Sequence, residues 1–455
     1  MRLPTGRLRP SDRRALALWL GSWVGVMFFV AVVPRVLPSI YDGKPYLDRW
    51  AQWDAVRFLN IATYGYGGVP GEKFDPGWPA FFPGYPLALK LVGLFTGGDY
   101  KLAGLVISFF AGGVAALALG RLAEDELNAR PVRKGLIRAR LSGWTSRIGA
   151  DTEDVEGEGA GGTVRRGVHA TDVAVSRTSV RRRSASSANG HAMDAATAAD
   201  EREPGDTAGT VGAGAVAAML AGPAAVFLFA GYSESLFLAF ALPAWLMARR
   251  GRWAWAALLA VPASAVRITG LFLVLAMIVE YVVGRHGRRE QGWGPVAWLV
   301  LPFAPLAAYT TYQWHRTGDW MAWQHAQEAG WHRQFTMPWD AFSLTWRSAF
   351  HSNYEFTLAF RIEIFAAAVG VLLSLYLLYR RRWPELAYVG LQLAALMTSS
   401  YYLSIGRATL LWWPLWVWFG VLALRHRWLF GAILAAAIPF AVIQLLTFSS
   451  GGWAG

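Results

Sequence analysis

Three charged residues lie within or beside long apolar runs of this sequence, where an ionised side chain needs a partner. Arg267 lies near the middle of the apolar stretch 254–284, Arg407 precedes another such run, and Glu234 begins a third. Guanidinium groups bind phosphate through paired hydrogen bonds, so these positions suit the phosphate of a lipid. Two other interpretations remain open: an arginine can extend its charge to a membrane surface, and Glu234 can cap the following helix.

An acid in segment 47–61 could act as a general base. Read as one helix, the segment places an acid among apolar residues on one face, by spacings of three and four residues: Leu47, Trp50, Asp54, Phe58 and Ile61. The tryptophans suggest a helix lying on the membrane. Asp54 is then positioned to accept a proton, with Arg57 one turn further on as its nearest cation. A solvated loop acid is the alternative.

Two further patterns have less specific interpretations. The sequence Phe81-Phe82-Pro83-Gly84-Tyr85-Pro86 could contact a substrate, or form an aromatic girdle at the entrance of a membrane segment. Four histidines lie between residues 313 and 356, but their spacing is irregular and does not favour a metal site. We therefore predict neither a metal nor a cofactor.

The elements that must position these residues are membrane helices. Of the 455 residues, 55% are hydrophobic and only 16% are charged, and the apolar residues are clustered in runs. We predict an all-α polytopic membrane protein with roughly 11–12 membrane segments. The net charge of +13 does not indicate nucleic acid, because the basic residues flank the apolar runs. There is no cysteine, which excludes disulfides.

Basic clusters set the expected topology, because lysine and arginine favour cytoplasmic loops. Such clusters occur in the N-terminal arm, at 249–252, at 285–289 and at 380–382. The first apolar run, 15–33, resembles a signal peptide, but its length favours an uncleaved span. Loops 37–79 and 313–356 then face outward, together with Arg267 and Arg407.

We predict three regions. Residues 1–120 hold the first membrane segments, residues 121–210 form a basic and then disordered insertion, and residues 211–455 complete the membrane bundle. Segment 150–208 has almost no large apolar residues and cannot build a core. The charge of 121–210 indicates the cytoplasmic side, which conflicts with two full spans at 81–97 and 102–120. The conflict disappears if one of the two, and by its prolines 81–97, is a half-span or an interfacial helix. Long loops can also escape the charge rule.

Several motifs together resemble the PIG-V-like proteins, which include the second mannosyltransferase of GPI-anchor synthesis and its bacterial relatives, in the GT-C glycosyltransferase superfamily. They occur in the family's order: Trp53-Asp54-Ala55, Phe81 to Pro86, Tyr232-Ser233-Glu234-Ser235-Leu236-Phe237, Arg267-Ile268-Thr269-Gly270, Thr317-Gly318-Asp319, Ala326-Gln327 with Trp331, and Arg407. The resemblance spans nearly the whole chain except the insertion. It departs at Gly84, where a bulkier residue is usual, and at Ala408, where tyrosine is common.

The resemblance implies a GT-C-type bundle and an inverting transfer of a mannosyl or other hexosyl residue. The donor would be a polyprenyl-phosphate sugar and the acceptor a lipid or glycan, at the outer face of a bacterial plasma membrane. Asp54 would be the catalytic base, and substrate binding would involve the remaining candidates: Arg57, Tyr85, Glu234, Arg267 and Arg407. The absence of a nucleotide-binding glycine loop agrees with a lipid-linked donor. A lipid flippase or transporter without transferase activity is the alternative.

Overall fold

The computed structural model describes residues 9–41, 43–153, 204–287, 292–351 and 356–454. Within these residues the chain is helical, and its only β-type pairing is one isolated bridge between Phe335 and Ser399. Residues 1–127 and 208–455 form one compact unit, and residues 128–207 form a second. The chain is therefore an all-α protein, as predicted, and the candidate residues all belong to the first unit.

Four described helices are long and apolar enough to cross a bilayer, judged by length and composition: α1 (Pro10–Val36), the first part of α4 (Tyr100–Glu153), α15 (Thr357–Tyr379) and α19 (Arg427–Ser450). Two bent pairs raise the number to six. One pair joins α6 (Pro204–Leu220) to η5 (Pro223–Ala225) and α7 (Val226–Phe229), and the other joins α17 (Ile405–Ala408) and η7 (Thr409–Leu411) to α18 (Trp413–Arg425). Several spans make this a polytopic membrane protein.

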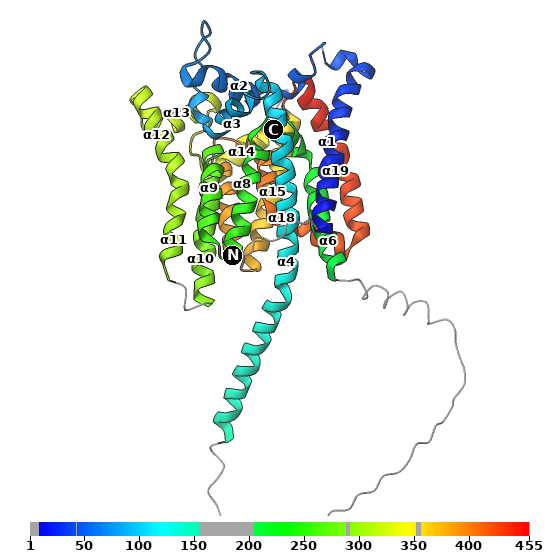
Figure 1. Ribbon diagram of the computed structural model, residues 1–455, viewed down its shortest axis with the longest axis vertical. Coiled ribbons are helices and arrows are strands. Elements are labelled where there is room, and N and C mark those ends of the chain that lie inside the picture. Colours follow the sequence, from blue (N-terminus) through cyan, green and yellow to red (C-terminus); the bar gives the residue numbers. More distant parts are fainter. Residues whose placement is uncertain (1–8, 42, 154–203, 288–291, 352–355, 455) are drawn as a thin grey trace, which may run out of the picture. The chain divides into compact units, whose positions relative to one another are not determined.

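The other apolar runs form shorter or interrupted helices. These are α8 (Ser233–Arg249), α9 (Trp253–Val266), α10 (Thr269–Gly287), α16 (Trp383–Met397), and the series α11 (Gly294–Ala297), η6 (Trp298–Phe303) and α12 (Ala304–Thr317). The predicted division of 254–284 near Arg267 is confirmed, because α9 ends and α10 begins on either side of this residue. In the compact unit α9 packs against α8, and α10 packs against α16 (Figure 1).

The segment that contains Asp54 is not one helix, contrary to the prediction. A 3₁₀ turn, η2 (Leu47–Trp50), is separated from α2 (Asp54–Tyr64) by a break at Trp53, which has a positive φ of 52°. Trp50 is buried rather than placed at a membrane surface. The break makes Asp54 the first residue of α2 instead of a residue in the middle of a longer helix.

The segment 81–97 is too short to cross a membrane. Its helix, α3 (Gly84–Gly93), has ten residues, whereas a crossing needs about 20. The half-span interpretation therefore fits the structure, and α4 becomes the next crossing after α1. Figure 1 shows α2, α3 and α13 (Ala322–Trp331) at the same end of the bundle. Between α13 and α15 the chain forms one more helix, α14 (Pro338–Phe350).

Basic residues from the predicted cytoplasmic turns meet acids of α4 in a network of ion pairs. Glu126 receives a bidentate pair from Arg382, at 2.7 and 2.8 Å, and lies 3.4 Å from Arg249. Arg249 also pairs with Glu280 at 2.8 Å, and Arg382 with Glu385. The turns at 249–252 and 380–382 therefore lie at one end of the bundle, as the charge pattern predicts.

The same end includes the start of α1, where Asp12 accepts two hydrogen bonds of 2.8 Å from Arg121 of α4. This places the N-terminal end of α1 beside the part of α4 that leads into the insertion. Most of the predicted disordered segment 150–208 lies outside the described residues; only its edges, 150–153 and 204–208, belong to α4 and α6.

The topology can be tested with single cysteines, because the chain has none of its own. Glu72 and Arg380 are both exposed, in the predicted outer loop and in a predicted cytoplasmic turn. An impermeant thiol reagent applied to intact cells should label Glu72→Cys and spare Arg380→Cys. Permeabilised cells, in which both should react, serve as the control. The reverse pattern in intact cells would place the candidate site on the cytoplasmic side.

Candidate active site

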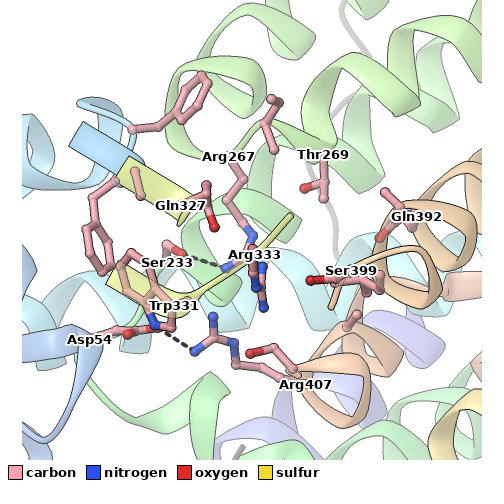
Figure 2. Close-up of a pocket in the computed structure, with 18 of the residues that line it drawn as sticks. Asp54, Ser233, Arg267, Thr269, Gln327, Trp331, Arg333, Gln392, Ser399 and Arg407 are labelled. Atoms are coloured by element: carbon pink, nitrogen blue, oxygen red, sulfur yellow. Dashed lines mark hydrogen bonds and ion pairs between the residues drawn. The ribbon is translucent and has the colours of Figure 1, made fainter. Parts of the chain in front are cut away.

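A cavity of about 480 Å³ lies where the predicted outer ends of the helices meet. Its walls come from the start of α2, the loop before α3, the α9–α10 junction, α13, the end of α16 and the region around α17. Three of the candidate residues line it, namely Asp54, Arg267 and Arg407. Segments distant in the sequence thus bring an acid and two arginines into one space (Figure 2).

Glu234 is the fully buried residue that joins the two arginines. Its Oε1 atom lies 2.7 Å from Nη1 of Arg267 and 3.0 Å from Nε of Arg407. The first contact is a hydrogen bond, whereas the second is an ion pair without hydrogen-bond alignment. Arg267 also donates to the hydroxyl of Ser233 at 2.8 Å. Both charges of the cavity wall are therefore fixed by one carboxylate behind it.

Arg407 also binds the candidate base. Its Nη1 donates to Oδ2 of Asp54 at 2.7 Å, and both side chains are largely buried, with 12% and 16% exposed. The guanidinium lies over the rings of Phe227 and Tyr232, 5.4 and 5.5 Å from their centres, where cation–π attraction adds to the ion pair. Arg407 therefore fixes the carboxylate of Asp54 at the cavity wall.

The position of Arg407 depends on a short helix with an unusual start. Ser404, which precedes the four-residue α17, has a left-handed backbone with φ of 65°. The buried carboxylate of Glu363 in α15 accepts hydrogen bonds from three successive amides, those of Ser404, Ile405 and Gly406, at 2.6–3.2 Å. Glu363 thereby satisfies amides that begin a helix and holds the turn that carries Arg407.

The position of Arg267 depends on the break between α9 and α10. Arg267 has extended backbone, so its side chain leaves the helix axis at this point. The break packs against Gly84, where an added Cβ would lie 2.5 Å from the carbonyl carbon of Ala265. A bulkier residue at position 84 would collide with this backbone.

Asp54 begins α2, where the free amides of a helix start favour a carboxylate. The preceding Trp53 turns the chain with its positive φ and donates from its indole nitrogen to the carbonyl of Gly452 at 2.9 Å. Its ring meets Trp453 edge-on, with centres 5.2 Å apart, and Trp453 lines the cavity. The segment after α19 therefore fixes the turn before Asp54.

Besides Glu234, two candidate residues do not line the cavity. Arg57 binds Asp75 at 3.1 Å and lies over the ring of Trp331, 5.4 Å from its centre. The cation that pairs with Asp54 is thus Arg407, and Arg57 instead supports Trp331, which lines the cavity. Tyr85 is fully buried and packs edge-on against Phe58, with ring centres 4.8 Å apart. It belongs to the core behind the cavity wall.

Comparison with family models, with curated proteins and with solved structures finds no match to this chain. What the cavity can do must therefore follow from its own side chains. It holds a carboxyl group that can exchange a proton, cationic groups that can bind an anion, and amide and aromatic side chains, including Gln327 and Trp331.

The motif Thr317-Gly318-Asp319 forms the turn after α12 and is not part of the cavity. Gly318 ends α12 in a left-handed conformation, with φ of 73°. Asp319 accepts a hydrogen bond from the amide of Met321 at 2.8 Å and pairs with His325 at 2.7 Å. The hydrogen bond with His325, followed by that from the amide, lowers the pKa of Asp319 below its usual value. Asp319 does not line the cavity.

Sequence reasoning missed three residues of the site: Arg333, Glu363 and Trp453. Glu363 had a detectable signal, because it is an acid inside the apolar run 357–379 and such an acid needs a partner. Arg333 and Trp453 had none, since Arg333 lies in the segment between α13 and α14 and Trp453 in the segment after α19, both of mixed composition. Arg333 lines the cavity in the space between Arg267 and Arg407 in Figure 2.

The dependence of both arginines on Glu234 predicts a large effect of Glu234→Gln. Without the carboxylate, two buried cations lose their shared partner, and removing one member of a buried pair typically costs about 3–5 kcal/mol. We expect a clear fall in the thermal midpoint of the purified protein in detergent. Asp319→Asn, at an exposed ion pair, should change it little. An unchanged midpoint for Glu234→Gln would contradict the bridging role.

Proposed function

We propose that the protein is a glycosyltransferase that moves a mannosyl or other hexosyl residue from a polyprenyl-phosphate sugar to a lipid or glycan acceptor. The observation that carries the proposal is the convergence of Asp54 and the arginines in one cavity at the predicted outer end of the membrane bundle. The ordered motifs that resemble PIG-V-like mannosyltransferases support it, since Asp54, Arg267, Gln327, Trp331 and Arg407 all meet there.

The cavity offers the two functions that such a transfer requires. An acceptor hydroxyl attacks C1 of the sugar from the side opposite the phosphate, and its proton passes to the carboxylate of Asp54. The bond between C1 and the phosphate oxygen breaks, which inverts the configuration at C1. The polyprenyl phosphate leaves with the bonding electrons, and guanidinium groups already in place stabilise its increasing negative charge.

The lining also suits an amphipathic donor. On one side lie Asp54, Gln327 and Trp331, where amide and aromatic groups can contact a sugar. On another side lie apolar residues of α10 and α16, including Phe272 and Leu396. A donor with its sugar toward Asp54, its phosphate at the arginines and its isoprenoid chain along α10 and α16 would place each chemical group against a matching wall.

Incubation of the purified protein with polyprenyl-phosphate mannose and lipid acceptors tests the proposal directly. Formation of a glycosylated lipid, detected by mass spectrometry, would support the transferase. Movement of lipid across a reconstituted bilayer without any glycosylated product would instead favour the flippase, which uses charged membrane residues without breaking a bond.

Asp54→Asn should lower turnover by about 10²–10⁴-fold, the usual contribution of a general base. The amide keeps the shape of the side chain but cannot take the proton. The Kd for the donor should not rise, because its phosphate contacts the arginines and an amide competes for Arg407 less than a carboxylate does. Asp48→Asn is the matched control, since Asp48 pairs with Lys101 at an exposed site. Turnover by Asp54→Asn within a few-fold of the parent, at equal protein level, would rule out this role.

A further inference from the structure

The three arginines of the cavity differ in how their charges are balanced. Arg267 and Arg407 each contact at least one carboxylate at 3.0 Å or less. Arg333 takes part in none of the ion pairs found among the described residues. Among the described residues its guanidinium makes one hydrogen bond, from Nη2 to the carbonyl of Leu403 at 3.0 Å, and its buried Nε has no partner.

Arg333 is held in place by its backbone. The segment follows His332, whose left-handed conformation ends α13, and the amide of Arg333 donates to the carbonyl of Gln327 at 3.2 Å. The hydroxyl of Ser400 donates to the carbonyl of His332 at 2.7 Å, and the amide of Thr336 donates to the carbonyl of Thr398 at 2.8 Å. The segment is thus fastened to the chain beyond α16, with its guanidinium in the cavity (Figure 2).

The charges of the cavity favour an anion at Arg333. Asp54 and Glu234 are already engaged by Arg267 and Arg407, and Glu363, whose charge also acts on Arg333, accepts hydrogen bonds from three backbone amides. None of these carboxylates forms an ion pair with Arg333. Burial, and then the positive charge of Arg407, lower the pKa of Arg333 below its usual value. A buried cation without a partner is costly, so a ligand with negative charge would stabilise the site.

We propose that Arg333 is the principal ligand of a phosphate group in this cavity, with Arg267 and Arg407 adding charge from either side. The planar guanidinium has five donors, and its unused Nε edge can hold two phosphate oxygens. The anion is a phosphate ester or free phosphate. The apolar wall at Phe272 and Leu396 favours an ester that carries a hydrocarbon chain.

This inference deepens the proposed function, since the phosphate would be that of the leaving group, but binding is measured without transfer. The full-length protein in detergent is titrated with farnesyl phosphate, farnesol and inorganic phosphate, and Kd is measured from ligand-dependent shifts in thermal midpoint. Farnesyl phosphate should bind at least about 10-fold tighter than farnesol. If inorganic phosphate binds as tightly as farnesyl phosphate, the phosphate is not recognised as part of a lipid. If farnesol binds as tightly as farnesyl phosphate, the cavity has no phosphate site.

Arg333→Gln should weaken farnesyl phosphate binding by about 10- to 100-fold, the loss expected for a charged hydrogen-bonding partner. Affinity for farnesol should stay the same. Without ligand, the thermal midpoint should not fall, because the substitution removes an uncompensated buried charge. Arg347→Gln is the matched control, since Arg347 is an exposed arginine on α14 outside this cavity. Parent-like phosphate affinity in Arg333→Gln would overturn the inference.

If the glutamine variant does not fold, Arg333→Lys tests the same inference. Lysine keeps the charge but not the planar pair of donors, so affinity for farnesyl phosphate should fall to a level between those of the parent and the glutamine substitution. An affinity equal to that of the parent would overturn the role of the guanidinium. Phosphate binding that depends on Arg333 without any sugar transfer would leave this inference standing and remove the transferase. If the protein transfers the sugar and Arg333→Gln binds farnesyl phosphate as tightly as the parent does, the transferase stands and this inference is wrong.

Discussion

The candidate site depends on one buried carboxylate. Glu234 is completely enclosed, and an ionised acid in such a place must be compensated by cations. Arg267 and Arg407 supply them from segments 33 and 173 residues away along the chain. Because both arginines must reach the same oxygen, the α9–α10 break and the short α17 have to meet the start of α8 at one point. The cavity forms where they meet.

Broken helices at this depth would leave amide groups unpaired unless other groups accepted their hydrogen bonds. Glu363 meets this need at α17 by accepting from three amides. A second buried acid is thus used for backbone geometry, while Glu234 is used for charge. The opposite end of the bundle is held differently, by side-chain ion pairs around Glu126. The helix breaks before Asp54, at Arg267 and before Arg407 lie at the cavity.

Much of this arrangement could be predicted from the sequence, since polar residues in apolar runs are conspicuous. Glu234, Arg267 and Arg407 were found in this way, and so was the division of 254–284. The pairing was not predictable: Asp54 binds Arg407, 353 residues away, and not Arg57 one turn along. Periodicity also suggested one helix over 47–61, but the positive φ at Trp53 is set by contacts with Gly452 and Trp453, which no local pattern reveals.

The sharing of Arg407 connects the two halves of the proposed chemistry. Its guanidinium is divided between Asp54 and Glu234, so an anion entering the cavity competes with Asp54 for the same donors. Under the proposed function, arrival of the donor phosphate would draw Arg407 away from Asp54 and leave that carboxylate free for the acceptor hydroxyl. Glu234 keeps Arg407 within reach of both, because its buried contact does not face the cavity. The ion pair would thus keep Asp54 from accepting a proton until the donor is bound.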